Sequence, residues 1–133
     1  MDTWCTPKPI MDFLANYNLS EWDPCPYPKP EWDGLEVDWL EKAKGKIIYC
    51  NPPYHSTSKW VKKMHDEWKR GVYVIGLIPA NRTDTTYWHE YVKGKAHVKF
   101  VQRKLKYINP NTDDETRALF PSLLVFYEPG ICG

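Results

Sequence analysis

The sequence lacks long hydrophobic runs and an excess of charge of either sign. Its longest apolar run, residues 72–78, is far shorter than the roughly 20 residues that a membrane span needs. The start Met1-Asp2-Thr3-Trp4 has no basic segment followed by an apolar one, so we expect a soluble protein without a leader or a membrane partner. Lys and Arg total 18 against 17 Asp and Glu, which argues against a disordered tail and a strongly basic nucleic-acid binder.

Cysteine and glycine are also scarce. The four cysteines, Cys5, Cys25, Cys50 and Cys132, show no Cys-x-x-Cys spacing, and no histidines cluster near them. This pattern indicates neither a zinc site nor a disulfide framework, so we predict a metal-free, reduced, cytoplasmic protein. There is no Gly-x-Gly after the first predicted strand, so a glycine-rich nucleotide-binding loop is missing too.

Proline and aromatic residues are abundant instead. The 133 residues leave room for a single domain, residues 1–133, and they include 12 prolines, 7 tryptophans and 9 tyrosines. Residues 23–32 carry a proline at every second position, which excludes a helix interior or a central strand there. We expect an extended, ordered loop.

Hydrophobic periodicity predicts alternating helices and strands. Thr6 can cap a first helix, and in a later helix Trp60, Val61, Met64 and Trp68 fall on one face. The alternation favours an α/β fold: a Rossmann-like, mostly parallel sheet with an antiparallel C-terminal strand and helices on both faces. We predict helices over residues 7–16, 38–44, 56–71 and 83–93, strands over 46–50, 72–78, 97–101, 103–108 and 122–127, and a mobile loop over 109–117.

Three unusual segments follow predicted strands or helices and meet at one edge of this sheet: residues 23–24, 51–54 and 79–82. Ligands of open parallel sheets bind at the carboxyl ends of the strands. We therefore expect a ligand site at this edge.

The tetrapeptide Asn51-Pro52-Pro53-Tyr54 suits the activation of an exocyclic amino group on a planar ring. The Asn51 side-chain oxygen and the Pro52 carbonyl can each accept one hydrogen bond from such a group, and the two prolines hold that carbonyl toward the site. Tyr54 offers a face for stacking. Two acceptors and a π-face preorganise a site at which positive charge develops.

In this tetrapeptide and the segments around it, the chain resembles the phage-type N-6-adenine DNA methyltransferases of the Dam family, which use S-adenosylmethionine. The likeness covers nearly the whole chain. The tetrapeptide is shared with methyltransferases of other amino acceptors, whereas the strings around it favour the DNA adenine group. The matching residues are Trp4, Thr6, Pro7, Asp23-Pro24-Cys25, Gly34-Leu35, Asp38-Trp39, Cys50 to Tyr54, Leu77 to Ala80, Arg82 to Thr85, Trp88-His89, Arg103 and Phe120-Pro121-Ser122.

The resemblance implies a set of cofactor contacts. Thr6 would bind the methionine carboxylate of S-adenosylmethionine, Asp23 would lie near its amino group, and Asp38 would accept from its adenine ring, with Leu35, Trp39 or Leu40 packed against that ring. Asp23 also fits an Asx turn before Pro24, and Asp38 fits an ordinary helix start. The expected cofactor-binding residues are Trp4, Thr6, Pro7, Asp23, Pro24, Asp38 and Trp39.

The resemblance also implies DNA as the substrate. Asn51, Pro52, Pro53 and Tyr54 would carry the chemistry on an adenine flipped out of the duplex. Arg82 and Asp84 follow a strand and would meet the nucleotide or a phosphate, or else cap the next helix; Arg103 would also contact substrate. Because the net charge is only +1, binding to duplex DNA must rely on local basic patches, with residues such as Lys99 and Lys104, or on a homodimer.

The expected function is thus transfer of a methyl group from S-adenosylmethionine to adenine N6 in DNA, in the host cytoplasm if the source is viral. One alternative is another amino acceptor: cytosine N4, RNA or a protein glutamine. The second alternative is a catalytically inactive nucleic-acid-binding module of the same fold.

Overall fold

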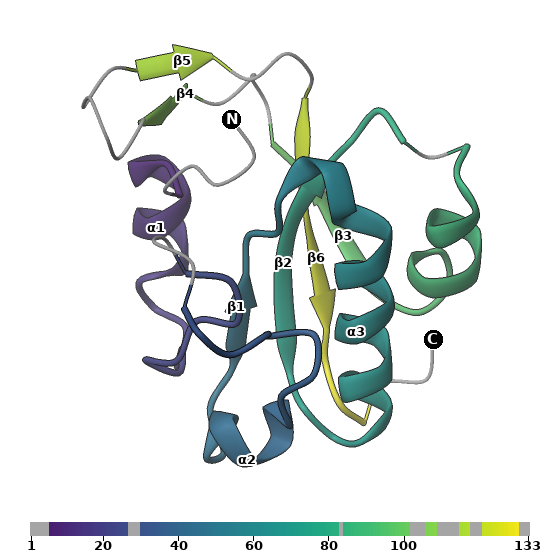
Figure 1. Ribbon diagram of the computed structural model, residues 1–133. Helices are drawn as coiled ribbons and strands as arrows, with labels where there is room; N and C mark the ends of the chain where they lie inside the picture. The colour runs from purple at the N-terminus through teal and green to yellow at the C-terminus, as the bar shows by residue number, and fades with distance from the viewer. Residues whose placement is uncertain are drawn as a thin grey trace.

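A computed structural model describes residues 6–26, 30–82, 84–101, 106–108, 115–117 and 121–130. Side chains are described for these residues except at positions 54, 106–108 and 115–117. Helices lie on both sides of a central sheet (Figure 1). The elements are α1 (Lys8–Leu14), α2 (Trp39–Ala43), β1 (Ile48–Cys50), the 3₁₀ turn η1 (Tyr54–Ser56), α3 (Thr57–Lys69), β2 (Val74–Pro79), the π-type turn η2 (Trp88–Val92), β3 (His97–Phe100), β4 (Lys106–Ile108), β5 (Glu115–Arg117) and β6 (Ser122–Tyr127).

The central sheet is mixed, with the strand order β1-β2-β6-β3. The β1–β2 pair is parallel, with Cys50 opposite Gly76, and β6 pairs antiparallel with both β2 and β3. The expectation of a mostly parallel sheet is therefore not confirmed, because β6 lies between β2 and β3 and reverses both of those pairings. The antiparallel C-terminal strand is confirmed, and the open α/β sheet is consistent with a methyltransferase-like fold.

The two faces of the sheet are covered by different helices. On one face Val61 and Met64 of α3 pack with alternate residues of β2 and β6. On the other face Ile10 and Leu14 of α1 pack with Ile75 and its alternate neighbours. All six residues of β2 and all six of β6 are buried, as unbroken apolar strands covered on both faces require. The prediction of helices on both faces is confirmed.

The connection from β1 to β2 decides where the site lies. Helix α3 leaves the carboxyl end of β1 and returns to the amino end of β2, so it runs antiparallel to both strands (Figure 1). Thirteen helical residues span about 20 Å. Residues at the start and the end of α3 therefore lie at opposite edges of the sheet.

Several local expectations change. The N-cap of α1 is Pro7 in extended conformation, with no side-chain cap, so Thr6 does not cap this helix as predicted. The predicted helix over 83–93 is represented by the π-type turn η2, followed by Gly94 with φ of 77°. Part of the predicted loop 109–117 forms β5, which pairs with β4. Within the described part of the chain, no helix is long and apolar enough to cross a bilayer.

Candidate functional site

The tip of β1 ends the strand and starts α3 within a few residues. Pro52 is buried, and Pro53 (φ −61°, ψ 139°) forms the N-cap of η1. The Pro53 carbonyl accepts from the Ser56 N–H at 3.2 Å and from the Thr57 hydroxyl at 3.4 Å. The backbone of Tyr54 begins η1, whereas its side chain lies outside the described part. Asn51 thus stands at the carboxyl end of β1, on a backbone fixed by two prolines.

The Asn51 side chain contacts a segment far away in the sequence. Its amide Nδ2 donates to Thr6 Oγ1 at 3.2 Å, and Thr6 Oγ1 lies 3.2 Å from the Tyr49 hydroxyl. Tyr49 precedes Asn51 by two residues, so the two side chains leave the strand on the same face. Thr6, Tyr49 and Asn51 are all half-buried. The structure therefore brings Thr6 to Asn51, two residues assigned separately by the resemblance.

The proline-rich loop holds the backbone of the same residue. Cys25 Sγ donates to the Asn51 carbonyl at 3.1 Å and lies 3.8 Å from Cys50 Sγ. The Cys25 N–H donates to Asp23 Oδ1 at 3.0 Å, which is the Asx turn considered as the alternative role for Asp23. Pro24 between them is buried. Asn51 is thus held at its side chain by Thr6 and at its carbonyl by Cys25.

Burial sets the ionisation of the acidic groups around this contact. The Asp23 carboxyl group is largely desolvated by the atoms around it, which raises its pKa above the ordinary value. The hydrogen bond from the Cys25 N–H lowers the pKa by a smaller amount. Asp23 as a whole residue remains exposed. Complete burial raises the pKa of the Cys50 thiol well above its usual range. Cys50 is therefore an uncharged core residue directly before Asn51.

A pocket of about 440 Å³ opens beside the tip, between the proline-rich loop and the start of α3. Trp32 and Leu35 provide apolar walls, and Asp33 provides a carboxylate whose Oδ1 accepts from the Leu35 N–H at 2.9 Å. The lining residues are Pro24, Cys25, Pro26, Pro30, Trp32, Asp33, Gly34, Leu35, Pro53, His55, Ser56, Ser58, Lys59 and Trp60. The pocket therefore lies between the β1 tip and residues 24–26 and 30–35 of the loop.

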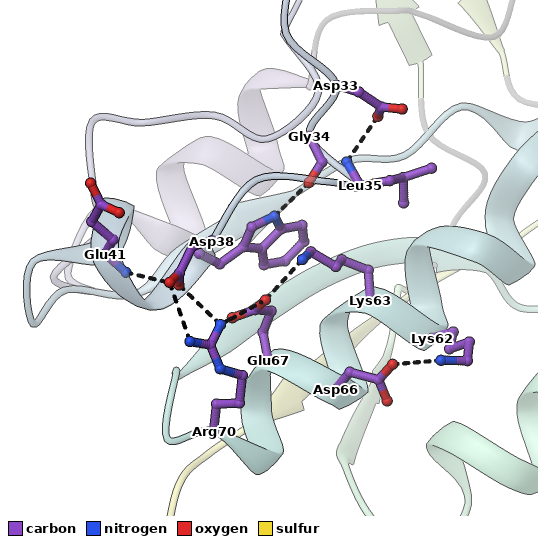
Figure 2. A network of polar contacts seen from close by, with 11 residues as sticks. Asp33, Gly34, Leu35, Asp38, Glu41, Lys62, Lys63, Asp66, Glu67 and Arg70 are labelled. Carbon is purple, nitrogen blue, oxygen red and sulfur yellow. Dashed lines mark hydrogen bonds and ion pairs between the residues drawn. The ribbon is translucent and has the colours of Figure 1, made fainter.

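Asp38 is not brought to this pocket. It is the N-cap of α2, where its Oδ1 accepts from the Glu41 N–H at 3.2 Å. Both of its oxygens accept from Arg70, at 3.0 and 3.2 Å, and Arg70 follows the far end of α3 (Figure 2). These hydrogen bonds hold the Asp38 pKa below its usual value. Trp39 is completely buried in the core, and Leu40 is exposed.

Two of the predicted substrate residues, Arg82 and Asp84, lie at the same edge of the sheet as Asn51. Arg82 and Asp84 follow the carboxyl end of β2 and are exposed, and the Arg82 carbonyl accepts from Thr85 Oγ1 at 2.6 Å. Trp4 and Arg103 lie outside the described residues. The described part therefore brings Thr6, Pro7, Asp23, Pro24 and the β1 tip together, and separates Asp38 from them.

Sequence reasoning missed three contributors to this region. Asp33 was given no role, Cys25 was noted only as a dispersed cysteine and as part of the family string Asp23-Pro24-Cys25, and Tyr49 was expected only as a strand residue. The signals were present: Asp33-Gly34 ends the proline-rich loop, and Tyr49 lies two residues before Asn51 on the same strand face.

Among the described residues, no group of three or more His, Cys, Asp or Glu side chains could hold a metal ion. A search of curated proteins finds no match for this chain. The family model described as DNA N-6-adenine-methyltransferase (Dam) matches residues 1–131 of the 133. The geometry of the β1 tip and a match over nearly the full length lead to one conclusion: the chain belongs to the Dam family of DNA N-6-adenine-methyltransferases.

Proposed function

We propose that this protein transfers a methyl group from S-adenosylmethionine to the N6 amino group of an adenine in DNA. The observation that carries the proposal is the position of Asn51. Its amide is held by Thr6 at the carboxyl end of β1, directly before Pro52-Pro53 and beside a pocket of about 440 Å³. Family membership supports the same activity.

The pocket fits the adenosine part of the cofactor. Its volume lies in the range of roughly 300 to 1,000 Å³ that is typical of small-molecule sites. Trp32 and Leu35 can cover the faces of a purine, and Asp33 can accept from its amino group. When bound, S-adenosylmethionine would supply a methyl group on a positively charged sulfur: the amino nitrogen would bond to the methyl carbon as the carbon–sulfur bond breaks to a neutral thioether, and the alkylated nitrogen would lose a proton to solvent. Asp33 therefore takes the role that the resemblance implied for Asp38, whose oxygens are bound to Arg70.

The remaining cofactor contacts extend from this pocket along the proline-rich loop. Asp23 and Pro24 lie next to Cys25, which bonds the Asn51 carbonyl, so a ligand in the pocket can reach the β1 tip past them. Pro7 is buried close to Thr6, and Trp4 precedes it in the sequence. The resemblance assigns to Thr6 a contact with the methionine carboxylate of the cofactor. That contact would compete with the hydrogen bond that Thr6 accepts from Asn51.

The acceptor side uses Asn51 and Pro52. The Asn51 Nδ2 donates to Thr6, so Oδ1 occupies the other end of the amide and accepts from the target amino group. The Pro53 carbonyl already accepts hydrogen bonds from Ser56 and Thr57 in the first turn after the strand. The second acceptor for the target amino group is therefore the Pro52 carbonyl. Both acceptors favour the positive charge that develops on the nitrogen, and Tyr54 supplies the stacking surface.

DNA reaches this edge of the sheet with its target base out of the stack. Extrusion of the base costs a few kcal/mol, which is least for an unpaired adenine. Arg82 is exposed beyond β2, and Lys99 of β3 places its Nζ 5.3 Å from the centre of the Phe13 ring. With a formal net charge of +1, phosphate binding must come from local basic side chains, so we expect short or weak sequence specificity.

The test is transfer of a labelled methyl group to DNA, followed by digestion to identify the labelled nucleoside. We expect N6-methyl-2′-deoxyadenosine. Label on cytosine, on RNA or on a glutamine would assign the alternative acceptors, and cofactor binding without transfer to any of them would indicate the inactive module. Asn51→Ala should abolish transfer and leave the affinity for S-adenosylmethionine nearly unchanged.

A further inference from the structure

A chain of two hydrogen bonds at the β1 tip ends on the Asn51 amide. Asn51 Nδ2 donates to Thr6 Oγ1 at 3.2 Å, and the Thr6 and Tyr49 hydroxyl oxygens lie 3.2 Å apart. All three side chains are half-buried. None of these contacts follows from the need to cap α1, whose N-cap is Pro7 without a side-chain cap.

Thr6 alone cannot decide which way the amide faces. A hydroxyl both donates and accepts, so Thr6 Oγ1 could accept from Nδ2 or, with the amide turned over, donate to Oδ1. The two orientations differ in which atom faces the acceptor site: an oxygen that binds the target amino group, or an NH₂ that repels it. A second partner that accepts the Thr6 proton would remove this ambiguity, and the Tyr49 hydroxyl oxygen lies within hydrogen-bond distance of Thr6 Oγ1.

We propose that Thr6 and Tyr49 are positioning residues that fix the orientation of the Asn51 amide for methyl transfer. In this arrangement the Thr6 hydroxyl donates to the Tyr49 oxygen, so Thr6 only accepts toward Asn51, and Nδ2 must face it. Oδ1 is thereby held on the acceptor side before the base arrives, which avoids reorganisation during the reaction. The inference rests on the proposed function of Asn51.

The sequence distance makes the arrangement dependent on the tertiary fold. Thr6 lies 45 residues before Asn51 and is placed by the segment that leads into α1, whereas Tyr49 is carried by β1 itself. Tyr49 also packs against the core cluster that α1 forms with β2 and β6. Docking of α1 on the sheet therefore completes the acceptor site.

The experiment compares Thr6→Val, Thr6→Ser and Tyr49→Phe with the unaltered protein. Valine keeps the shape of threonine without its hydroxyl, serine keeps the hydroxyl, and phenylalanine keeps the ring. We expect Thr6→Val to lower kcat about tenfold or more, Tyr49→Phe to lower it by a smaller factor, and Thr6→Ser to stay within about threefold. The KM for S-adenosylmethionine should stay unchanged in all three.

The split between kcat and KM separates this role from direct cofactor binding. A Thr6 that binds the methionine carboxylate would raise KM for the cofactor in Thr6→Val, and full kcat in Thr6→Val would also overturn the inference. Thermal denaturation checks the fold of each variant. If Thr6→Val does not fold, the decision passes to Tyr49→Phe, for which an unchanged kcat overturns the proposal.

A second readout does not depend on activity. In nitrogen–proton NMR spectra, the Asn51 side-chain NH₂ signals are identified by their loss in Asn51→Ala. In the unaltered protein, the two NH₂ protons should exchange slowly with water and have well-separated chemical shifts. In Thr6→Val, they should exchange quickly and their shifts should approach those of a solvent-exposed amide. Thr6→Ser should restore the original behaviour. Unaltered signals in Thr6→Val would sink the inference even if no DNA methylation is found, whereas missing transfer with the expected signals would count against the proposed function alone.

Discussion

The indole Nε1–H of Trp39 donates to the backbone carbonyl of Gly34 at 2.8 Å, inside the core. Gly34 belongs to the loop that lines the pocket, and Trp39 opens α2. One hydrogen bond therefore ties the wall of the pocket to a helix that contacts neither DNA nor cofactor in the proposed function.

Replacement of Trp39 by phenylalanine should destabilise the protein. The Gly34 carbonyl would lose its donor while remaining buried, which costs about 1 to 3 kcal/mol in the free energy of unfolding. Urea denaturation measures the change. The matched control is Trp32→Phe at an indole that is 38% exposed, where we expect less than about 0.5 kcal/mol. Equal effects at both positions would contradict the importance of the hydrogen bond.

Gly34 has no room for a side chain. A Cβ built there would lie 1.9 Å from the Pro24 carbonyl oxygen and 2.9 Å from the Trp60 ring. Gly34→Ala must displace backbone, so we expect a loss of about 1 to 3 kcal/mol in stability together with weaker cofactor binding. Glu36→Ala, at an exposed position of the same loop, is the control, and a fully stable Gly34→Ala with normal cofactor affinity would refute the packing argument.

Two neighbouring ion pairs on α3 should contribute unequally (Figure 2). Lys62–Asp66 has 56% and 46% exposed side chains, whereas Lys63–Glu67 has 17% and 4%. Glu67→Gln should cost about 1 to 3 kcal/mol because the buried carboxylate would lose its charge toward both Lys63 and Arg70. Asp66→Asn should cost less than about 1 kcal/mol. Chemical denaturation of both variants compares them, and the reverse order would be evidence against burial as the deciding factor.

The Asp38–Arg70 pair should make stability depend on acidity. Hydrogen bonds from Arg70 lower the Asp38 pKa below 3.8 in the folded state, so the unfolded chain binds the proton more readily. The stabilisation by the Asp38–Arg70 pair is therefore fully present above the ordinary Asp pKa. It is lost as the pH falls through the lower pKa that Asp38 has in the folded state. Asp38→Asn keeps a good N-cap and removes the charge.

Denaturation of the unaltered protein and of Asp38→Asn as a function of pH tests this dependence. The difference in unfolding free energy should be constant well above the ordinary Asp pKa and should shrink as the pH falls through the lower pKa of the folded state. A difference that persists undiminished in acid would show that the carboxylate charge is not its cause.

Cofactor affinity should distinguish the two acidic residues of the loop. Asp33→Asn retains an oxygen for the Leu35 N–H but loses the negative charge in the pocket. We expect the Kd for S-adenosylmethionine to rise about tenfold, which corresponds to about 1.4 kcal/mol. Asp38→Asn should leave it unchanged. Calorimetric titration measures both, and the opposite result would restore Asp38 as the cofactor residue.

Elements with a strong local pattern could be predicted from the sequence. Trp60, Val61 and Met64 are buried on α3 at the predicted spacing, and the apolar run at 72–78 corresponds closely to β2. The tip after β1 follows from prolines that stop a strand. Each of these inferences needs only neighbours within one element.

The contacts that complete the site depend on distant residues. The hydrogen bond between Asn51 and Thr6 spans 45 positions, and the one between Arg70 and Asp38 spans 32. Asp33 and Asp38 look alike in the sequence, and only the placement of Arg70 at the end of α3 separates them. The insertion of β6 between β2 and β3 is likewise a property of the assembled sheet.

Four indole rings lie in series from the pocket wall into the core. Ring centres are 5.4 Å apart for Trp22 and Trp32, 6.1 Å for Trp22 and Trp39, and 6.4 Å for Trp39 and Trp60. At these separations excitation energy passes readily from ring to ring, so a purine stacked on Trp32 would quench emission from the whole series. In the proposed function, tryptophan emission should therefore report occupancy of the pocket in a ligand titration without an added fluorophore.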